Sequence, residues 1–158
     1  MKEEEYRKYL SRASRLCAGK EKCKQDILKK VAQWGLDTDT GERIIDDLKK
    51  ANFIDHQRYA EAFARDKLRF NHWGRRKIEY ALRSKNIEDI HIQHALDNLP
   101  EEQYHSILLD ELEKKHQSIK TNDLQERKSK LCQFLLQKGF ESGKVFEFVD
   151  YRLRQIDN

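Results

Sequence analysis

Residues 26–36 read DILKKVAQWGL, and their pattern is the strongest indication of the fold in this chain. Ile27 and Val31 lie four residues apart, so they share one face of a helix, and Gly35 follows four residues later. Glycine often closes a helix because it adopts the left-handed backbone conformation, and an apolar residue such as Leu36 then packs back onto the last turn. The stretch therefore predicts an amphipathic helix that ends at a glycine cap.

The same pattern recurs twice along the chain, in residues 77–87 (KIEYALRSKNI) and in residues 130–140 (KLCQFLLQKGF). Asn86 and Gly139 stand where the first copy has its glycine, and asparagine also enters the left-handed conformation. The three copies begin 51 and 53 residues apart. Near-equal periods of this length are typical of repeated supersecondary units.

Each repeat has room for two further helices, and polar residues that can cap or open a helix mark their starts. The expected starts are Asp39 with Glu42, Asp55, Pro100, Asp123 with Glu126, and Ser142. The expected apolar stripes include Tyr6 with Ala13 and Cys17, Cys23 with Ile27, Tyr59 with Phe63 and Phe70, and Val145 with Val149 and Ile156. The sequence thus predicts an all-α fold of nine helices in three tandem three-helix modules (1–52, 53–99 and 100–158), elongated and curved.

The composition agrees with small modules that have thin cores. Apolar residues make up 37% of the 158 residues and charged residues 38%, whereas typical domains have roughly 45–50% and 25%. Two Trp, six Tyr and seven Phe argue against disorder. The chain shows no apolar run of membrane-spanning length and no signal-peptide core at its start, so we expect a cytoplasmic protein with reduced cysteines and no membrane partner.

Catalytic and metal-binding patterns are missing from the sequence. It contains no phosphate-binding glycine loop, no dinucleotide fingerprint and no zinc-protease or nucleophile-elbow motif, so we expect neither an enzyme nor a cofactor. His91 and His94 could share a helix face, but two ligands do not complete a metal site. Cys17 and Cys23 lie on expected core stripes and are interpreted as structural.

Positive charge is concentrated in residues 65–85, which hold eight basic and two acidic side chains, a net charge of +6 against +4 for the whole chain. Arginines fall opposite the apolar stripes of two consecutive helices, so they face outward and could contact phosphates. The alternative is a solvated charged face without a ligand. Trp73 could stack on a base or pack against the next helix. The candidate binding residues are Arg58, Arg65, Arg69, Trp73, Arg75, Arg76, Lys77 and Arg83.

Several of these residues belong to motifs that resemble the RecX family, the bacterial regulators of the RecA recombinase, in its Bacteroidetes-type form. The resemblance rests on residues 53–63 (FIDHQRYAEAF), 66–78 (DKLRFNHWGRRKI) and 82–87 (LRSKNI), with further matches in 16–35 and 130–140. His56 and Gln57 stand where the family often has a second acidic residue, Asn86 replaces a common glycine, and Lys138 replaces the usual arginine.

The resemblance implies a non-enzymatic, monomeric protein that lies in the groove of the RecA–DNA filament. Such a protein restrains the ATPase, strand-exchange and co-protease activities of RecA, and it also contacts single- and double-stranded DNA. The residues themselves leave a second reading open, in which the chain is a stand-alone helical DNA- or RNA-binding protein. Binding to RecA without nucleic acid would separate the two readings.

Overall fold

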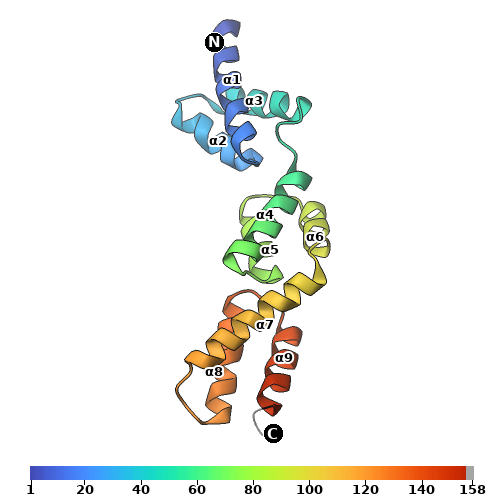
Figure 1. The fold of residues 1–158 in the computed structure, drawn as a ribbon. Helices are drawn as coiled ribbons and strands as arrows, with labels where there is room; N and C mark the ends of the chain where they lie inside the picture. Colours follow the sequence, from blue (N-terminus) through green and yellow to red (C-terminus); the bar gives the residue numbers. More distant parts are fainter. Residues whose placement is uncertain (156–158) are drawn as a thin grey trace. The chain divides into compact units, whose positions relative to one another are not determined.

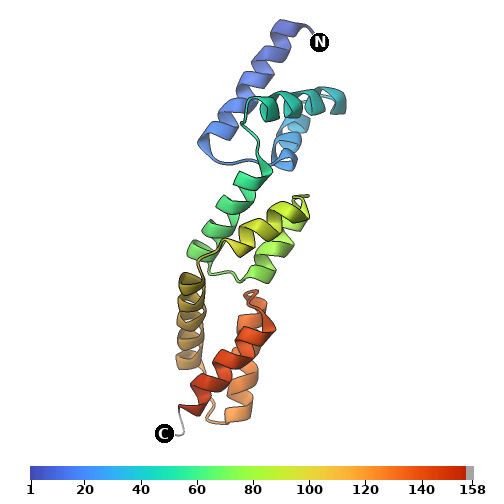
Figure 2. The ribbon, with the colours of Figure 1, turned by 90° about the vertical axis from the view of Figure 1, so that its right-hand side faces the viewer.

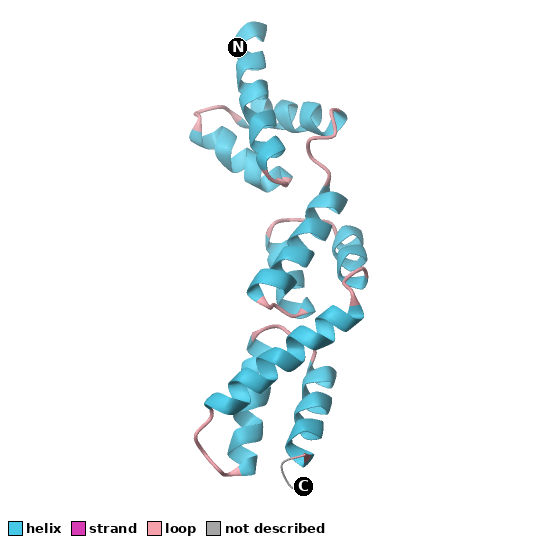
Figure 3. Cartoon of the chain, viewed as in Figure 1, coloured by secondary structure: helices cyan, strands magenta, loops and turns pink. Residues whose placement is uncertain are grey.

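The computed structural model describes residues 1–155, and in that range the chain forms nine α-helices and no strand (Figure 3). The helices are α1 (Glu3–Gly19), α2 (Lys24–Gln33), α3 (Thr38–Lys50), α4 (His56–Asn71), α5 (Arg75–Ser84), α6 (Asp89–Asp97), α7 (Glu101–Ser118), α8 (Leu124–Gln137) and α9 (Ser142–Arg154). The predicted all-α class is confirmed. The module boundaries and the elongated outline stay predictions.

The chain divides into two compact units. The first unit comprises residues 1–62 and 82–94. Its main core lies where α3 packs against both α1 and α2, as the blue and teal part of Figure 1 shows. The buried side chains of this core are Tyr6, Ala13, Cys17, Ile27, Val31, Ile44, Ile45, Leu48 and Ile54. The predicted stripe of the first helix, which holds Tyr6, Ala13 and Cys17, is therefore confirmed.

The second unit comprises residues 63–81 and 95 onward. In it α8 packs against both α7 and α9, which lie side by side with α8 in Figures 1 and 2. Its fully buried side chains include Tyr104, Leu108, Leu131, Leu135, Phe140, Val145 and Val149. Val145 and Val149 confirm the predicted stripe of the last helix, whereas Ile156 lies outside the described residues.

The three predicted helix caps are confirmed. Gly35, Asn86 and Gly139 have φ angles of 81°, 59° and 96°, all in the left-handed region. At each cap the next apolar residue donates its backbone N–H to the carbonyl five residues earlier: Leu36 to Val31 (3.3 Å), Ile87 to Leu82 (3.2 Å) and Phe140 to Leu135 (3.2 Å). This backbone pairing is that of the Schellman motif. The repeat found in the sequence is thus a repeat of cap geometry.

Two predicted helix starts are wrong, whereas Asp55 and Asp123 cap α4 and α8 as predicted. Asp37, and not Asp39 with Glu42, caps α3, because its side chain accepts from the backbone N–H of Thr40 at 2.8 Å. The N-cap of α9 is Glu141, one residue before Ser142. The Glu141 carboxylate makes no cap bond, since Tyr104 and Arg75 already engage it.

Two predicted core positions also differ. On α4 the buried side chains are Tyr59, Ala60, Ala64 and Leu68, whereas Phe70 is 69% exposed and Phe63 is only half-buried. The small Ala64 was overlooked because the larger Phe63 stands beside it. Cys23 is fully buried, but it is the N-cap of α2 rather than a member of the helix.

Candidate functional site

Arg65, Arg69 and Arg76 are exposed on the second unit, on two consecutive helices. Arg65 and Arg69 are four residues apart on α4, one position beyond the buried Ala64 and Leu68, so both project from the same exposed face. Within residues 1–155, no carboxylate forms an ion pair with any of the three arginines. Their charges therefore remain available to an outside anion.

Trp73, in the turn between α4 and α5, connects these two helices through cation–π contacts. The Nζ atom of Lys67 on α4 lies 4.9 Å from the indole centroid, and that of Lys77 on α5 lies 4.7 Å from it. The indole is half-buried, so the ring both packs between the helices and keeps an exposed edge. Two ammonium groups beside one aromatic ring extend the positive surface across the turn.

Arg75 lies among the candidate residues in the sequence, but its side chain is only 15% exposed. Its guanidinium contacts the carboxylates of Glu141 at 3.1 Å and Glu101 at 2.5 Å, and it covers the Tyr104 ring at 4.0 Å. The Tyr104 hydroxyl accepts from the backbone N–H of Arg75 and donates to Glu141. Burial acts to raise the pKa of Glu141, but the hydrogen bonds from Tyr104 and Arg75 hold it below its ordinary value. Arg75 therefore stabilises the fold.

Arg58 and Arg83 belong to the first unit. The Arg58 Nε atom donates to both carboxylate oxygens of Glu21 at 2.7 and 2.8 Å, which ties the start of α4 to the loop before α2. Arg83 pairs with Asp89 at 2.8 Å and remains half-exposed. The structure thus places Arg65, Arg69, Trp73, Arg76 and Lys77 in one unit and gives Arg58 and Arg75 internal partners.

A close backbone contact, which no local sequence pattern indicates, fixes the position of Arg76. The turn before α5 meets the turn before α9: the Gly74 N–H donates to Lys138 O at 2.8 Å, and the Arg76 N–H donates to Gly139 O at 2.9 Å. A Cβ on Gly74 would lie 2.3 Å from the Gly139 carbonyl carbon, and a Cβ on Gly139 would lie 2.4 Å from Lys77 Cβ. We call this contact the glycine junction.

Side-chain contacts hold α2 to the later helices of the first unit. Lys85 pairs with Asp26 at 2.8 Å. The His56 Nε2 atom accepts from the backbone N–H of Lys24 at 3.1 Å, while its Nδ1 atom lies 2.9 Å from Glu88. A ring that accepts at Nε2 carries its proton at Nδ1, which then donates to Glu88. We call this set of contacts the ionic junction.

Metal ligands and reactive thiols are not assembled in the part of the chain that the structure describes. Among residues 1–155, no three His, Cys, Asp or Glu side chains are grouped to hold an ion. The His91 and His94 rings both hydrogen-bond to Gln57, at 2.6 Å each. Burial raises the pKa of the Cys17, Cys23 and Cys132 thiols, which favours the unreactive protonated form. No helix in this range is long and apolar enough to cross a bilayer.

These features define the class: an all-helical protein with a repeated helix cap and exposed cationic side chains on its second unit. Comparison with known proteins agrees. Residues 55–96 match the family model described as "RecX, second three-helix domain", and residues 101–149 match "RecX, third three-helix domain". The two matches together cover more than half of the chain. The chain belongs to the RecX family.

Individual relatives give the same result. The chain is 32% identical over 143 residues to "Regulatory protein RecX" of Clostridium perfringens strain 13, which covers 89% of this chain and 66% of the relative. It is 29% identical to the protein of the same name from Prosthecochloris aestuarii, over 95% of this chain and 97% of the relative. The chain therefore spans about two thirds of the clostridial protein and nearly all of the Prosthecochloris protein.

Solved structures confirm an all-α fold with repeated three-helix domains. A crystal structure of regulatory protein RecX matches with a TM-score of 0.82 and 25% identity, over 92% of this chain and 72% of that one. The crystal structure of RecX from Lactobacillus salivarius matches with a TM-score of 0.80 and 20% identity, over 96% of this chain and 98% of that one.

Proposed function

We propose that this chain is a non-enzymatic regulator of the RecA recombinase that binds in the groove of the RecA–DNA filament. In this role it restrains the ATPase, strand-exchange and co-protease activities of RecA. Membership of a family of regulatory proteins supports the proposal, as does the absence of a recognised enzyme motif in the sequence. The partners are the RecA filament and its single- or double-stranded DNA.

The observation that carries the proposal is the set of exposed arginines on the second unit, Arg65, Arg69 and Arg76. Because these side chains form no ion pair within residues 1–155, binding an anion does not require an ion pair to break. Trp73 and Lys77 adjoin them through the α4–α5 turn. We propose that Arg58, Arg75 and Arg83 stabilise the fold of their own units rather than contact the partner directly, since each has an ion-pair partner.

The test is RecA ATPase on single-stranded DNA, titrated with this protein at substoichiometric ratios. We expect ATP hydrolysis by RecA to fall, with no hydrolysis by this chain alone. The variant Arg65→Gln/Arg69→Gln/Arg76→Gln should lose much of the inhibition. If each arginine contacts one phosphate, the salt slope of single-strand binding should also fall by about 2, at about 0.7 per contact.

The matched control removes three exposed lysines of the first unit, Lys8, Lys29 and Lys50, each to Gln. It carries the same charge change and should inhibit RecA as the unmodified protein does. Equal losses in both variants would show that total charge, and not this surface, is responsible. A chain that binds DNA but never affects RecA would instead support the alternative, a stand-alone DNA- or RNA-binding protein.

A further inference from the structure

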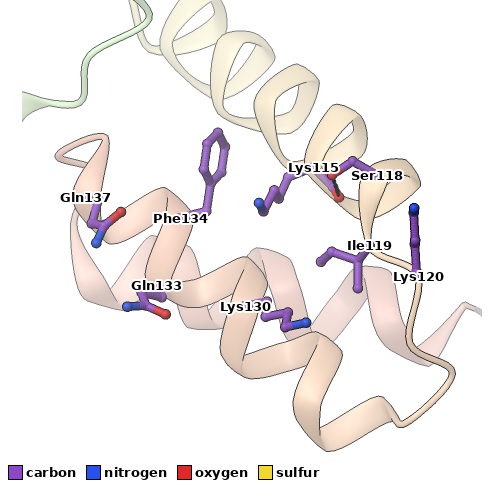
Figure 4. Close-up of a pocket in the computed structure, with 8 residues that line it drawn as sticks. All are labelled: Lys115, Ser118, Ile119, Lys120, Lys130, Gln133, Phe134 and Gln137. Carbon is purple, nitrogen blue, oxygen red and sulfur yellow. Dashed lines mark hydrogen bonds between the residues drawn. The ribbon is translucent and has the colours of Figure 1, made fainter.

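A hollow of about 450 Å³ lies on the second unit, between the end of α7, the loop after it and α8 (Figure 4). Its volume is within the roughly 300–1,000 Å³ of small-ligand pockets. Its lining side chains are Lys115, Ser118, Ile119, Lys120, Lys130, Gln133, Phe134 and Gln137. None of these residues is among the candidate binding residues predicted from the sequence. They lie apart in the sequence from the exposed arginines proposed above.

The charge of this hollow is positive. Three lining residues are lysines and none is acidic. The acidic residues of α7 nearest to Lys115 in the sequence are already engaged, since Glu111 contacts His72 at 2.5 Å and Glu113 pairs with Arg152 at 2.8 Å. Hydrogen bonding from Arg152 lowers the pKa of Glu113, so this carboxylate is charged, and its negative charge is paired with the arginine rather than with the lysines of the hollow.

Among the described residues, Lys130 is the one lining lysine that forms an ion pair with a carboxylate, and that pair is weak. Its Nζ lies 3.1 Å from Glu126 one helical turn away, and both side chains are half-exposed. An exposed pair of this kind contributes only about 0.5 kcal/mol, so a bound anion can replace it. Lys115, Lys120 and Lys130 therefore all give positive charge to the lining of this hollow.

An aromatic ring lies beside these ammonium groups. Phe134 is half-buried, and Lys115 Nζ lies 5.2 Å from its ring centroid. Figure 4 shows the Phe134 ring projecting from α8 toward α7, with the Lys115 side chain reaching toward it. The amides of Gln133 and Gln137 follow on α8 and offer both donors and acceptors.

Ammonium groups, an aromatic face and amides together suit a nucleotide. Lysines bind phosphate, aromatic rings stack on bases of any sequence, and amides bond to base edges. An acidic peptide would use the lysines alone and give Phe134 no role. We propose that this hollow binds one nucleotide of a single-stranded nucleic acid, with the base against Phe134 and the adjoining phosphates on Lys115, Lys120 and Lys130.

The test uses the full chain and a fluorescein-labelled oligothymidylate of 12 nucleotides, with affinity followed by anisotropy at several salt concentrations. Phe134→Leu keeps an apolar side chain and removes the stacking surface. We expect it to weaken binding about fivefold or more, because stacking on one aromatic side chain is worth at least about 1 kcal/mol per base. The matched control is Phe146→Leu on α9, an aromatic that is 46% exposed, and it should change affinity less than twofold.

The charge part of the proposal has its own variant. Lys120→Gln/Lys130→Gln should lower the salt slope by about 1.4, at about 0.7 per lost phosphate contact. The double variant Lys8→Gln/Lys29→Gln should leave the slope unchanged. If circular dichroism shows that Phe134→Leu loses helix content, the salt slope of the lysine variant tests the proposal alone. Exposed lysines can be replaced without disturbing the hydrophobic core.

Four results would overturn the proposal. Unchanged affinity of a folded Phe134→Leu variant would show that no base stacks on Phe134. An unchanged salt slope in the lysine variant would show that Lys120 and Lys130 contact no phosphate. Polyglutamate that competes as strongly as oligothymidylate would identify an acidic polymer instead. Thymidine monophosphate that competes as well as the strand, per mole of nucleotide, would identify a free nucleotide as the ligand.

Discussion

The glycine junction and the ionic junction hold helices together in opposite ways. In the first unit, Lys85 meets Asp26 and His56 meets Glu88 through their side chains, all of which are partly exposed except that of His56. In the second unit, Gly74 and Gly139 bring two backbones into direct hydrogen bonding. The difference teaches where this protein tolerates change: long side chains can find new partners, whereas a backbone contact with no room for a Cβ cannot adjust.

The largest expected effect is therefore at the glycine junction. Gly139→Ala would place a methyl group 2.4 Å from Lys77 Cβ at a residue with φ of 96°. We expect the free energy of unfolding to fall by about 3 kcal/mol, because overpacking and left-handed strain add together. Urea unfolding measures this value. The control is Gly143→Ala, four residues away in α9 with open space around its Cα, which should stabilise the protein by about 0.5–1 kcal/mol. Equal effects at both sites would contradict the distinction.

A smaller effect is expected at the hydroxyl that supports the same junction. Tyr104→Phe keeps the buried ring but removes the donor to Glu141 and the acceptor for the Arg75 N–H. We expect a loss of about 2 kcal/mol of unfolding free energy, since buried polar groups are left unpaired. Thermal unfolding measures the change against Tyr151→Phe, a 61% exposed tyrosine that should be near neutral. A loss no greater than that of Tyr151→Phe would show that water replaces the hydroxyl.

The smallest effect is expected at the ionic junction. Lys85→Gln removes the partner of Asp26 from a partly exposed pair, so it should cost about 0.5 kcal/mol at pH 7. Burial acts to raise the pKa of Asp26, but hydrogen bonds from Lys85 and Cys23 hold it below its ordinary value. A lowered folded-state pKa gives stability that is present above the unfolded-state pKa and is lost as the pH falls through the folded-state pKa.

The difference between Lys85→Gln and the unmodified chain should therefore shrink as the pH falls below the ordinary aspartate pKa of about 3.9, because protonation of Asp26 removes the ion pair. Urea unfolding between pH 7 and pH 2.5 follows this change. A difference that persists at acidic pH would assign the effect to packing of the lysine stem rather than to the ion pair.

Local sequence patterns were enough to predict the helices and their repeated caps. Gly35, Asn86 and Gly139 could be recognised as caps because the left-handed conformation is a local property of the residue. The position of Asp55 and Asp123 before their helices was equally local, since an N-cap bonds to a backbone only two or three residues away. Asp37 was missed because Asp39 offered the same chemistry two residues later.

Only the tertiary structure decided which charged residues are available. Arg75 and Arg76 are neighbours with the same side chain, yet Arg75 is buried against Glu101 and Glu141 while Arg76 is exposed. Those partners lie 26 and 66 residues further along the chain, and no local pattern links them to the arginine. The hollow beside Phe134 is also a tertiary feature, because it requires the end of α7 and the face of α8 to meet. Local sequence fixes backbone conformation, but ion pairs and hollows depend on which distant residues the packed helices bring together.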